Sequence, residues 1–348
     1  MNPLIASAQA LMAPGKGLLA MDESIGTCNR RFAELAIAPT EEARRRYRQL
    51  LVTAPGLAEF VSGVILFDET LQQRSDDGTS FIEVLNAAGI LVGIKLDSGA
   101  KALAGHPDER VTEGLDGLRE RLQRYAAQGA RFAKWRAVLS IGYGLPSRAC
   151  IQANAHALAR YAALCQEAGL VPIVEPEVLM EGGHALARCS DATAEVLHRV
   201  FEQLHQQGVV LEGMILKPNM LLPGIDCATP VSLDEVADAT LSCLLRSVPA
   251  AVAGIAFLSG GQPAELATAR LNAMHLHHSA LVAPAAALPW PLTFSFGRAL
   301  QQPALATWAG DDGNRVIAQT ALLHRARCNA AALRGTYRPA LETAGGLA

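Results

Sequence analysis

Lysines and carboxylates stand at the ends of several short apolar runs of the sequence. They are Asp22, Lys95, Lys134, Glu175, Glu177 and Lys217. A lysine amine has an unperturbed pKa of about 10.4, so at neutral pH it is protonated and not nucleophilic. If Lys134 and Lys217 lie close together, their repulsion favours the neutral form of one of them, which can attack a ketone or an aldehyde.

A carboxylate beside such an amine could carry the protons that imine formation and bond cleavage require. Glu175 is well placed in the sequence for this task, because it follows an apolar run that starts at Leu170. Amine and carboxylate together predict iminium chemistry on a carbonyl substrate. The residue types alone leave both Lys134 and Lys217 open as the nucleophile.

Two glycine-containing turns suggest anion binding. In Ser259-Gly260-Gly261, backbone N–H groups can approach a phosphate closely, and Gly297-Arg298 opens a probable helix whose N-terminus favours negative charge. A second anion could be held across the site. The residues predicted for it are Ser24, Thr27, Arg31 and Lys95.

Eight short apolar runs position these groups. They start at Gly17, Gly63, Leu91, Arg131, Leu170, Leu211, Val252 and Leu292. Helix-patterned stretches lie between them, among others at residues 116–128, 149–167, 192–207 and 233–246. Apolar runs that alternate with helices are typical of a parallel sheet buried on both faces, and eight of them favour a closed barrel. We therefore expect an α/β fold with a single (β/α)8-barrel domain over residues 1–335 and a C-terminal extension, 336–348, whose composition suggests mobility.

In such a barrel the active site lies at the C-terminal ends of the strands. Side chains two apart on a strand share a face, so Lys134 points the same way as Arg136, and Glu175 the same way as Glu177. A purely structural barrel would fill these positions with Val, Ile and Leu. The repetition of charge at most of the strand ends therefore predicts one site at the mouth.

Composition excludes several other functions. The chain has 348 residues, half of them hydrophobic, and 30 basic against 33 acidic residues give a net charge of −3, so nucleic acid is not an expected partner. Its seven cysteines never form CxxC, which indicates reduced thiols and neither a disulfide framework nor a zinc site. The N-terminus does not resemble a signal peptide, and the uncharged segment 279–296 contains three prolines. We expect a cytoplasmic protein without a membrane span.

Two other charged or histidine-rich segments have simpler interpretations. Residues 41–48 (EEARRRYR) are predicted to form a solvated helix face that begins after Thr40 as N-cap. His275, His277 and His278 lie between the seventh and eighth runs, away from the strand ends. A helix-end or loop role is expected for them, and no metal is predicted.

The sequence resembles class I fructose-bisphosphate aldolases from about Gly15 to Tyr337. The motifs that carry the resemblance, in chain order, are GKGLLAMDES, SGVILFDET, GIKLD, GLDGL, FAKWR, VPIVEPE, LKPNM, FLSGGQ and FSFGRALQ. The resemblance implies that Lys217 forms the Schiff base, that Glu175 is the main proton donor and acceptor, and that Asp22, Lys134 and Glu177 stabilise intermediates. It also implies a set of substrate-binding residues. They are Arg31, Ser259, Gly260, Gly261, Ser295 and Arg298, with Lys95 near the second phosphate.

The implied reaction is the reversible cleavage of D-fructose 1,6-bisphosphate into dihydroxyacetone phosphate and D-glyceraldehyde 3-phosphate, with neither a metal nor another cofactor. A homotetramer is expected from the same resemblance. Two departures stand out. The family's motif after DES commonly ends in Lys-Arg, whereas this chain has Asn29-Arg30-Arg31, and the chain ends in GLA where many members carry a terminal tyrosine for enamine protonation. Its last tyrosine is Tyr337, so another group or water is predicted to take that step.

Three alternatives have their own signals. The first is another Schiff-base barrel, such as a transaldolase or an aldolase for a different sugar phosphate. Two phosphate-holding sets on opposite sides of the mouth favour a bisphosphate, but fructose 1-phosphate could also be cleaved. A zinc-dependent aldolase would need histidines at strand ends, where the sequence has none. A barrel kept only as a binding scaffold would be favoured by loss of Lys217 or Glu175, and both are present.

Overall fold

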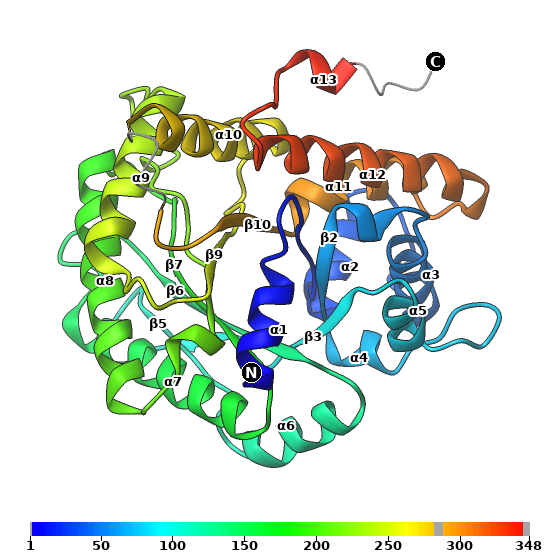
Figure 1. The fold of residues 1–348 in the computed structure, drawn as a ribbon, viewed down its shortest axis with the longest axis horizontal. Coiled ribbons are helices and arrows are strands. Elements are labelled where there is room, and N and C mark those ends of the chain that lie inside the picture. Colours follow the sequence, from blue (N-terminus) through cyan, green and yellow to red (C-terminus); the bar gives the residue numbers. More distant parts are fainter. Residues whose placement is uncertain (1, 282–287, 344–348) are drawn as a thin grey trace.

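Eight parallel strands close into a barrel in the computed structural model, which describes residues 2–281 and 288–343 (Figure 1). The strands are β1 (Gly17–Met21), β2 (Val61–Leu66), β3 (Leu91–Lys95), β6 (Phe132–Leu139), β7 (Val171–Val178), β8 (Ile215–Leu216), β9 (Gly254–Phe257) and β10 (Leu292–Phe296). They neighbour one another in this order, and β10 pairs with β1 to close the ring. Each of the eight apolar runs supplies one strand, so the predicted (β/α)8 barrel is confirmed.

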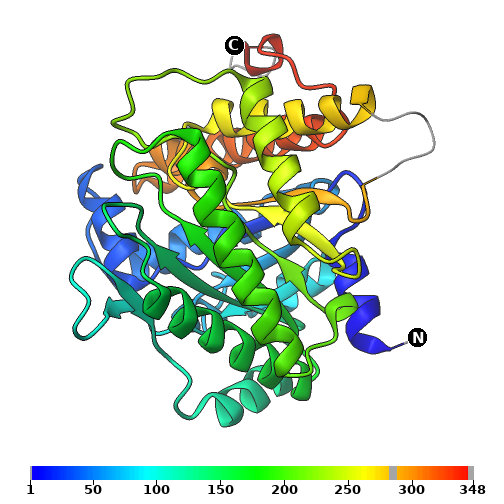
Figure 2. The same ribbon diagram turned by 90° about the vertical axis from the view of Figure 1, so that its left-hand side faces the viewer.

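Helices surround the barrel, as the alternating pattern predicted. They are α2 (Ile25–Ala33), α3 (Glu41–Val52), α4 (Asp68–Leu71), α5 (Phe81–Ala87), α6 (Leu118–Ala127), α7 (Arg148–Glu167), α8 (Leu186–Gln206), α9 (Leu233–Ser247), α10 (Ala264–Leu281), α11 (Arg298–Trp308) and α12 (Arg315–Ala332). Short 3-10 turns occur at Leu57–Glu59, Leu211–Gly213 and Asp312–Asn314, and β4 (Ala100–Ala102) pairs with β5 (Arg110–Thr112) as a separate hairpin. Figure 2 shows α8 running alongside the strands on the outside of the barrel. The helix predicted from residue 192 begins earlier, at Leu186.

The N-terminal helix α1 (Pro3–Leu11) closes the N-terminal end of the barrel and lies over its centre in Figure 1. Leu11 and Met12 join side chains from the strands in one buried interior cluster. Glycines make room for this packing: a Cβ at Gly93 would lie only 2.2 Å from the Phe132 ring, and one at Gly254 only 2.4 Å from Met12. The filled interior leaves the opposite, C-terminal end of the barrel as the open one.

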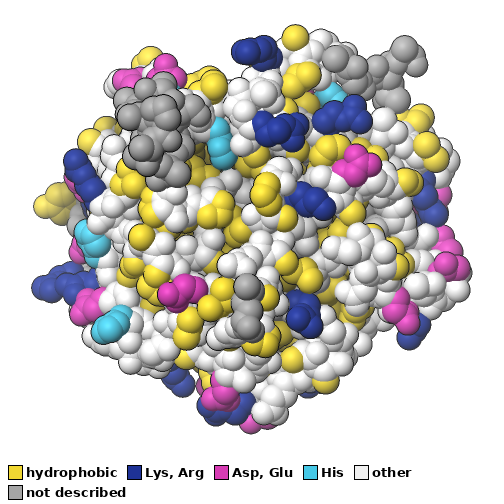
Figure 3. Space-filling model, in the orientation of Figure 1, with side chains coloured by type: hydrophobic (Ala, Val, Ile, Leu, Met, Phe, Trp, Pro, Cys, Tyr) yellow, Lys and Arg dark blue, Asp and Glu magenta, His cyan; other side chains and the backbone are white. Residues whose placement is uncertain are grey.

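The surface seen from the α1 side has no single charge sign. On this face basic and acidic side chains lie mostly towards the rim, with hydrophobic side chains scattered between them (Figure 3).

The segment 279–296, which carries no charge, starts in the last turn of α10 and ends in β10. Within residues 2–281 and 288–343 no helix is long and apolar enough to cross a membrane.

The C-terminal extension is in part packed against the body. Tyr337 is only 5% exposed, its N–H donates to Asn272, and α13 (Ala340–Thr343) follows. Glu342 on α13 pairs with Arg325 of α12. The rest of the segment expected to be mobile, residues 344–348, lies outside the described residues.

Candidate active site

Four charged side chains meet at the C-terminal end of the barrel. The Lys134 amine lies 2.7 Å from Asp22 Oδ2 and 3.3 Å from Glu175 Oε2, and the Lys217 amine lies 3.1 Å from Glu175 Oε1. All four side chains are buried. The parallel strands bring them together: Asp22 and Lys217 directly follow β1 and β8, whereas Lys134 and Glu175 lie within the longer strands β6 and β7.

Local backbone geometry places Lys217. Its N–H donates to Val174 O at 2.8 Å, which extends the pairing of β7 and β8 by one residue. Pro218 follows and disfavours helical geometry at Lys217, so the lysine stays extended. Its side chain therefore enters the barrel mouth beside Glu175.

The two lysines differ in their electrostatic surroundings. Burial by itself would lower the pKa of Lys134, but Asp22 and Glu175 outweigh it and raise that pKa well above its usual range. Burial likewise opposes ionisation of Glu175, yet Lys134 and Lys217 hold its pKa below the ordinary value. Lys134 is thus a permanent cation between two carboxylates, whereas Lys217 contacts one. Of the two amines, Lys217 therefore has the smaller set of carboxylate partners.

A second group of charges lies nearer to solvent. Arg136, whose side chain is 44% exposed, pairs with the buried carboxylate of Glu177. Lys95 is fixed by Asp97, whose Oδ1 lies 2.6 Å from the Lys95 amine. Asp97 also accepts from the Arg136 N–H at 3.3 Å, so one carboxylate orders both neighbouring strand ends. The sequence analysis did not select Asp97, although its position two residues after Lys95 was the available signal.

An open cavity of about 960 Å³ contains all of the residues that the sequence assigned to the site. Its lining includes Asp22, Ser24, Thr27, Arg31, Lys95, Lys134, Arg136, Glu175, Glu177, Lys217, Ser259, Gly260, Gly261, Ser295, Gly297 and Arg298. Among the described lining residues there is neither a histidine nor a cysteine. The structure therefore brings the predicted residues together in one cavity.

One side of this cavity is suited to an anion. Gly260 and Gly261 adopt φ values of +56° and +85°, which an L side chain rarely adopts. A Cβ at Gly261 would lie 3.2 Å from Arg298 Nη2, so this arginine comes close to the glycine backbone. The hydroxyl of Ser295 is buried and makes no hydrogen bond. Arg298 is also the first residue of α11, whose N-terminus favours negative charge.

A neighbouring part of the cavity carries the N-terminus of α2, because β1, which precedes this helix, pairs with β10. Ser24 caps this helix by accepting from the Thr27 N–H at 3.4 Å. Arg31, predicted to hold phosphate, is buried and already paired with Glu23 at 2.5 Å. Arg30 belongs to the segment Asn29-Arg30-Arg31, where the family pattern commonly ends in Lys-Arg. Its guanidinium donates to Thr27 Oγ1. Positive charge is therefore kept at this end of the cavity.

The expectation of a solvated helix face at residues 41–48 was wrong in part. Thr40 does cap α3, accepting from the Ala43 N–H. Arg48, however, is only 2% exposed and lies 2.6 Å from Glu23, while Arg44 is buried against Glu69. The interpretation failed because the acidic partners come from other elements and are invisible to the helix pattern. Glu23 thus binds two buried arginines, one of which lines the cavity.

Glu23→Gln is expected to lower the free energy of unfolding by about 3–5 kcal/mol, because it leaves the buried Arg31 and Arg48 without a counter-charge. Urea denaturation at neutral pH measures this. Burial by itself raises the pKa of Glu23, but Arg48 and Arg31 outweigh it and lower that pKa. The carboxylate therefore stabilises the fold above its unfolded-state pKa, and the effect is lost as pH falls through its lower folded-state pKa.

The matched control is Glu42→Gln. Glu42 pairs with Arg45 at 2.6 Å, but its side chain is largely exposed, so a change of less than about 1 kcal/mol is expected. The role of Glu23 as counter-charge would be contradicted if both variants lost the same free energy of unfolding. It would also be contradicted if the loss in Glu23→Gln were as large at acid pH as at neutral pH.

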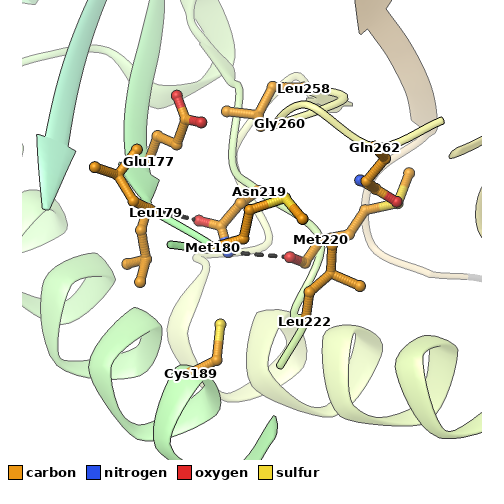
Figure 4. Close-up of a pocket in the computed structure, with 11 residues that line it drawn as sticks. Glu177, Leu179, Met180, Cys189, Asn219, Met220, Leu222, Leu258, Gly260 and Gln262 are labelled. Carbon is orange, nitrogen blue, oxygen red and sulfur yellow. Dashed lines mark hydrogen bonds between the residues drawn. The ribbon is translucent and has the colours of Figure 1, made fainter. Parts of the chain in front are cut away.

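Asn219 connects the end of β7, the strand of Glu175, with the loop after β8, which begins at Lys217 (Figure 4). Its Oδ1 accepts from the Val178 N–H at 2.9 Å, and its Nδ2 donates to Met220 O at 3.1 Å. The strand β8 has only two residues, so the regular pairing with β7 ends near Lys217. The buried amide of Asn219 replaces the missing pairing and holds the end of β7 against the loop after β8. The sequence analysis did not select this residue.

Asn219→Ala is expected to lower kcat by up to about 10²-fold with little change in KM, because displacements of about 1 Å at a reacting group cost that much. Steady-state kinetics measure the two constants. Asn154 is the control: it is also buried and bonds Thr112 N and Arg110 O, but it lies on α7 and holds β5, not the end of β7. Asn154→Ala should lose stability and keep kcat. Equal kcat values in the two variants would refute the connecting role.

The remaining candidates lie elsewhere. His277 lies between Asp234 and Asp238 on the outer helices, at 2.8 and 2.9 Å, as the expected helix role requires. The side chain of His278 lies outside the described residues. Tyr337 donates its hydroxyl to Glu342, and burial first and then this carboxylate raise its pKa. It is not among the described residues that line the cavity.

Comparisons with known proteins identify relatives of the whole chain. A family model described as fructose-bisphosphate aldolase class-I matches residues 3–346. A protein of Xanthomonas axonopodis pv. citri, named probable fructose-bisphosphate aldolase class 1, is 53% identical over 96% of this chain and 98% of its own length. The cytosolic fructose-bisphosphate aldolase 6 of Arabidopsis thaliana is 50% identical over 97% and 92%.

A solved structure has the same fold. Fructose-bisphosphate aldolase from Plasmodium falciparum superposes with a TM-score of 0.93 at 44% identity, covering 97% of this chain and 95% of that one. The family match spans nearly all of the chain, and the identities extend over the whole barrel. The chain belongs to the class I fructose-bisphosphate aldolase family.

Proposed function

We propose that this aldolase cleaves D-fructose 1,6-bisphosphate through a Schiff base on Lys217. The observation that carries the proposal is the contact of the Lys217 amine with Glu175, 3.1 Å away, inside a cavity that arginines and the N-termini of α2 and α11 also line. The reaction is reversible and serves glycolysis and gluconeogenesis. Its products are dihydroxyacetone phosphate and D-glyceraldehyde 3-phosphate.

Imine formation needs an amine that loses its proton and a group that carries protons. Glu175 contacts the Lys217 amine, so it can accept the ammonium proton as the nitrogen attacks the C2 ketone. The same carboxyl then returns a proton to the C2 hydroxyl, which leaves as water and gives the iminium. Lys134 stays charged between Asp22 and Glu175 and stabilises both carboxylates.

Bond cleavage follows from the iminium. A carboxylate of the cluster removes the C4 hydroxyl proton, the C3–C4 electron pair moves toward the iminium, and glyceraldehyde 3-phosphate leaves. The resulting enamine is protonated at C3, and hydrolysis releases dihydroxyacetone phosphate and the free lysine. We assign the orientation of these intermediates to Asp22, Lys134 and Glu177.

The two phosphates are assigned to two different regions of the cavity. One region offers the backbone of Ser259, Gly260 and Gly261 with Ser295, Gly297 and Arg298. The other offers Ser24, Thr27 and Arg31, and Lys95 and Arg136 line the cavity from β3 and β6. Because each region is cationic or carries a helix N-terminus, a substrate with a phosphate at each end is held across Lys217.

We infer that the reaction needs no metal, because lysine, carboxylates and the iminium supply the electron sink and the proton transfers. Full activity after dialysis against EDTA checks this. A cytoplasmic location and a homotetramer are part of the same proposal. The location is supported by relatives named as cytosolic isozymes, and size-exclusion chromatography with light scattering tests the tetramer.

Borohydride reduction in the presence of substrate, followed by peptide mass mapping, tests the mechanism. A stable adduct of dihydroxyacetone phosphate on Lys217 is the expected result. An adduct on another lysine, or none, would overturn the proposed nucleophile. Exchange of the C3 proton of dihydroxyacetone phosphate, compared before and after removal of residues beyond Gly335, shows whether the extension takes part in enamine protonation.

A further inference from the structure

Three side chains with metal-binding atoms meet on the outside of the barrel. His324 and Cys328 are one turn apart on α12, and Glu342 reaches them from α13. His324 Nε2 lies 3.7 Å from Cys328 Sγ and 3.4 Å from Glu342 Oε2, and the three atoms all lie within 4.8 Å of one another. None of the three lines the cavity described above. The proposed reaction therefore does not use them.

The spacing of these atoms matches tetrahedral coordination. Zinc binds histidine nitrogen at about 2.05 Å, carboxylate oxygen at about 2.1 Å and cysteine sulfur at about 2.3 Å. At tetrahedral angles these bond lengths put nitrogen and oxygen roughly 3.4 Å apart, and nitrogen and sulfur roughly 3.6 Å apart. The observed distances from His324 Nε2, 3.4 Å to Glu342 Oε2 and 3.7 Å to Cys328 Sγ, are almost the same as these values. Two of the three ligand pairs thus have the spacing that a zinc ion requires, and the third pair lies within 4.8 Å.

The carboxylate ligand is oriented by further hydrogen bonds. Tyr337 donates to Glu342 Oε1 at 2.9 Å, and Arg325 donates to Oε2. Each carboxylate oxygen has two lone pairs, so both oxygens can accept these bonds while Oε2 retains a lone pair for a metal. Arg325 is itself held by Thr268 at 2.6 Å, which fixes its position beside the carboxylate. Such hydrogen-bonded support is usual for metal ligands.

The chemistry of the ligand set favours zinc over harder ions. Thiolate and imidazole suit zinc, whereas magnesium and calcium prefer sites made of oxygen atoms. Cys328 is only 2% exposed. Zinc binds cysteine as the thiolate, so binding at this site releases the thiol proton.

We propose that His324, Cys328 and Glu342 bind one zinc ion that fastens the C-terminal extension to α12. Water completes the fourth position. The site is structural and separate from catalysis, so it is compatible with a metal-independent reaction. It departs from the expectation that the cysteines form no zinc site, because that expectation rested on CxxC spacing and not on cysteine with histidine along one helix.

Cobalt titration of the full-length, untagged and metal-free protein tests the site. A thiolate-to-cobalt charge-transfer absorption that saturates at one equivalent per chain, and that zinc abolishes, is expected. Cys328→Ser should remove this absorption, and Tyr337→Phe should weaken zinc binding about 10–100-fold because Glu342 loses its support. Unchanged circular dichroism and unchanged aldolase activity show that each variant is folded.

The matched control is Cys243→Ser. Cys243 is also buried, with a thiol pKa raised by burial to about 11, but it lies on α9 and bonds Ser190 O. This variant should keep the cobalt absorption. Absence of the absorption in the unmodified protein, or its survival in Cys328→Ser, would overturn the proposal. So would zinc binding that leaves hydrogen exchange across residues 337–343 unchanged, since Glu342 is the ligand supplied by the extension.

Discussion

Lys217→Met is expected to lower kcat by at least about 10³-fold and to abolish trapping by borohydride. Methionine fills a similar volume but has no amine, so the covalent route through an imine is closed, and losing a nucleophile of this kind costs several orders of magnitude. The fold should survive, because Glu175 keeps its ion pair with Lys134 at 3.3 Å. Steady-state cleavage assays and mass mapping of the reduced protein provide the measurements.

The variant Lys134→Met tests which of the two lysines is the nucleophile. Lys134 is also buried at the mouth of the barrel, but it lies between Asp22 and Glu175, which raise its pKa against the opposing effect of burial. This variant should lose activity and still form an adduct on Lys217 when substrate and borohydride are present for long enough. Trapping that persists in Lys217→Met, or that disappears only in Lys134→Met, would assign the nucleophile to Lys134 instead.

Glu175→Gln is expected to lower kcat about 10²–10⁴-fold, the usual range for a general acid–base group. The amide has nearly the same shape but cannot take a proton from Lys217 or return one to the departing water. In the unmodified protein, burial opposes ionisation of Glu175, yet the two lysines outweigh it and keep its pKa below 4.5. If ionisation of Glu175 controls activity, kcat/KM of the unmodified protein falls with decreasing pH only below pH 4.5. The Glu175→Gln variant should not show this fall.

The control for this variant is Glu181→Gln. Glu181 lines the same cavity but is exposed, and no role in the reaction is assigned to it. Its replacement should leave kcat within a factor of about two. If the two glutamine variants had equal kcat values, or if the fall at acid pH were unchanged in Glu175→Gln, proton transfer would have to be assigned to another carboxylate.

The strands were predictable because their signal is local. A run such as VPIVEPEV is apolar on both faces except at two positions, and all eight residues of this strand are buried in the barrel. Alternation with helices then requires parallel strands, and parallel strands put their C-terminal ends at one edge. Asp22, Lys134, Glu175 and Lys217 could therefore be assigned to one site from the sequence.

Pairwise contacts between distant elements could not be predicted in this way. The residue types alone left Lys134 and Lys217 both open as the nucleophile, and only the fold places Lys134 between two carboxylates and Lys217 beside one. The pattern at residues 41–48 indicated a solvated face, and only the fold brings Glu23 against Arg48. Which side chains meet depends on how each element is rotated and shifted against the next, and no local pattern records that.

The same distinction holds for the residues that support the site and for the zinc proposal. Asn219 bonds Val178 because β8 stops after two residues, and Glu342 reaches His324 because the extension folds back onto α12. By itself, the sequence determined the barrel, the edge that carries the chemistry and, through its motifs, the family. The tertiary structure alone decided the charge environment of each lysine and the partners of each buried ion, because burial and distance control ionisation and both arise only when the elements pack.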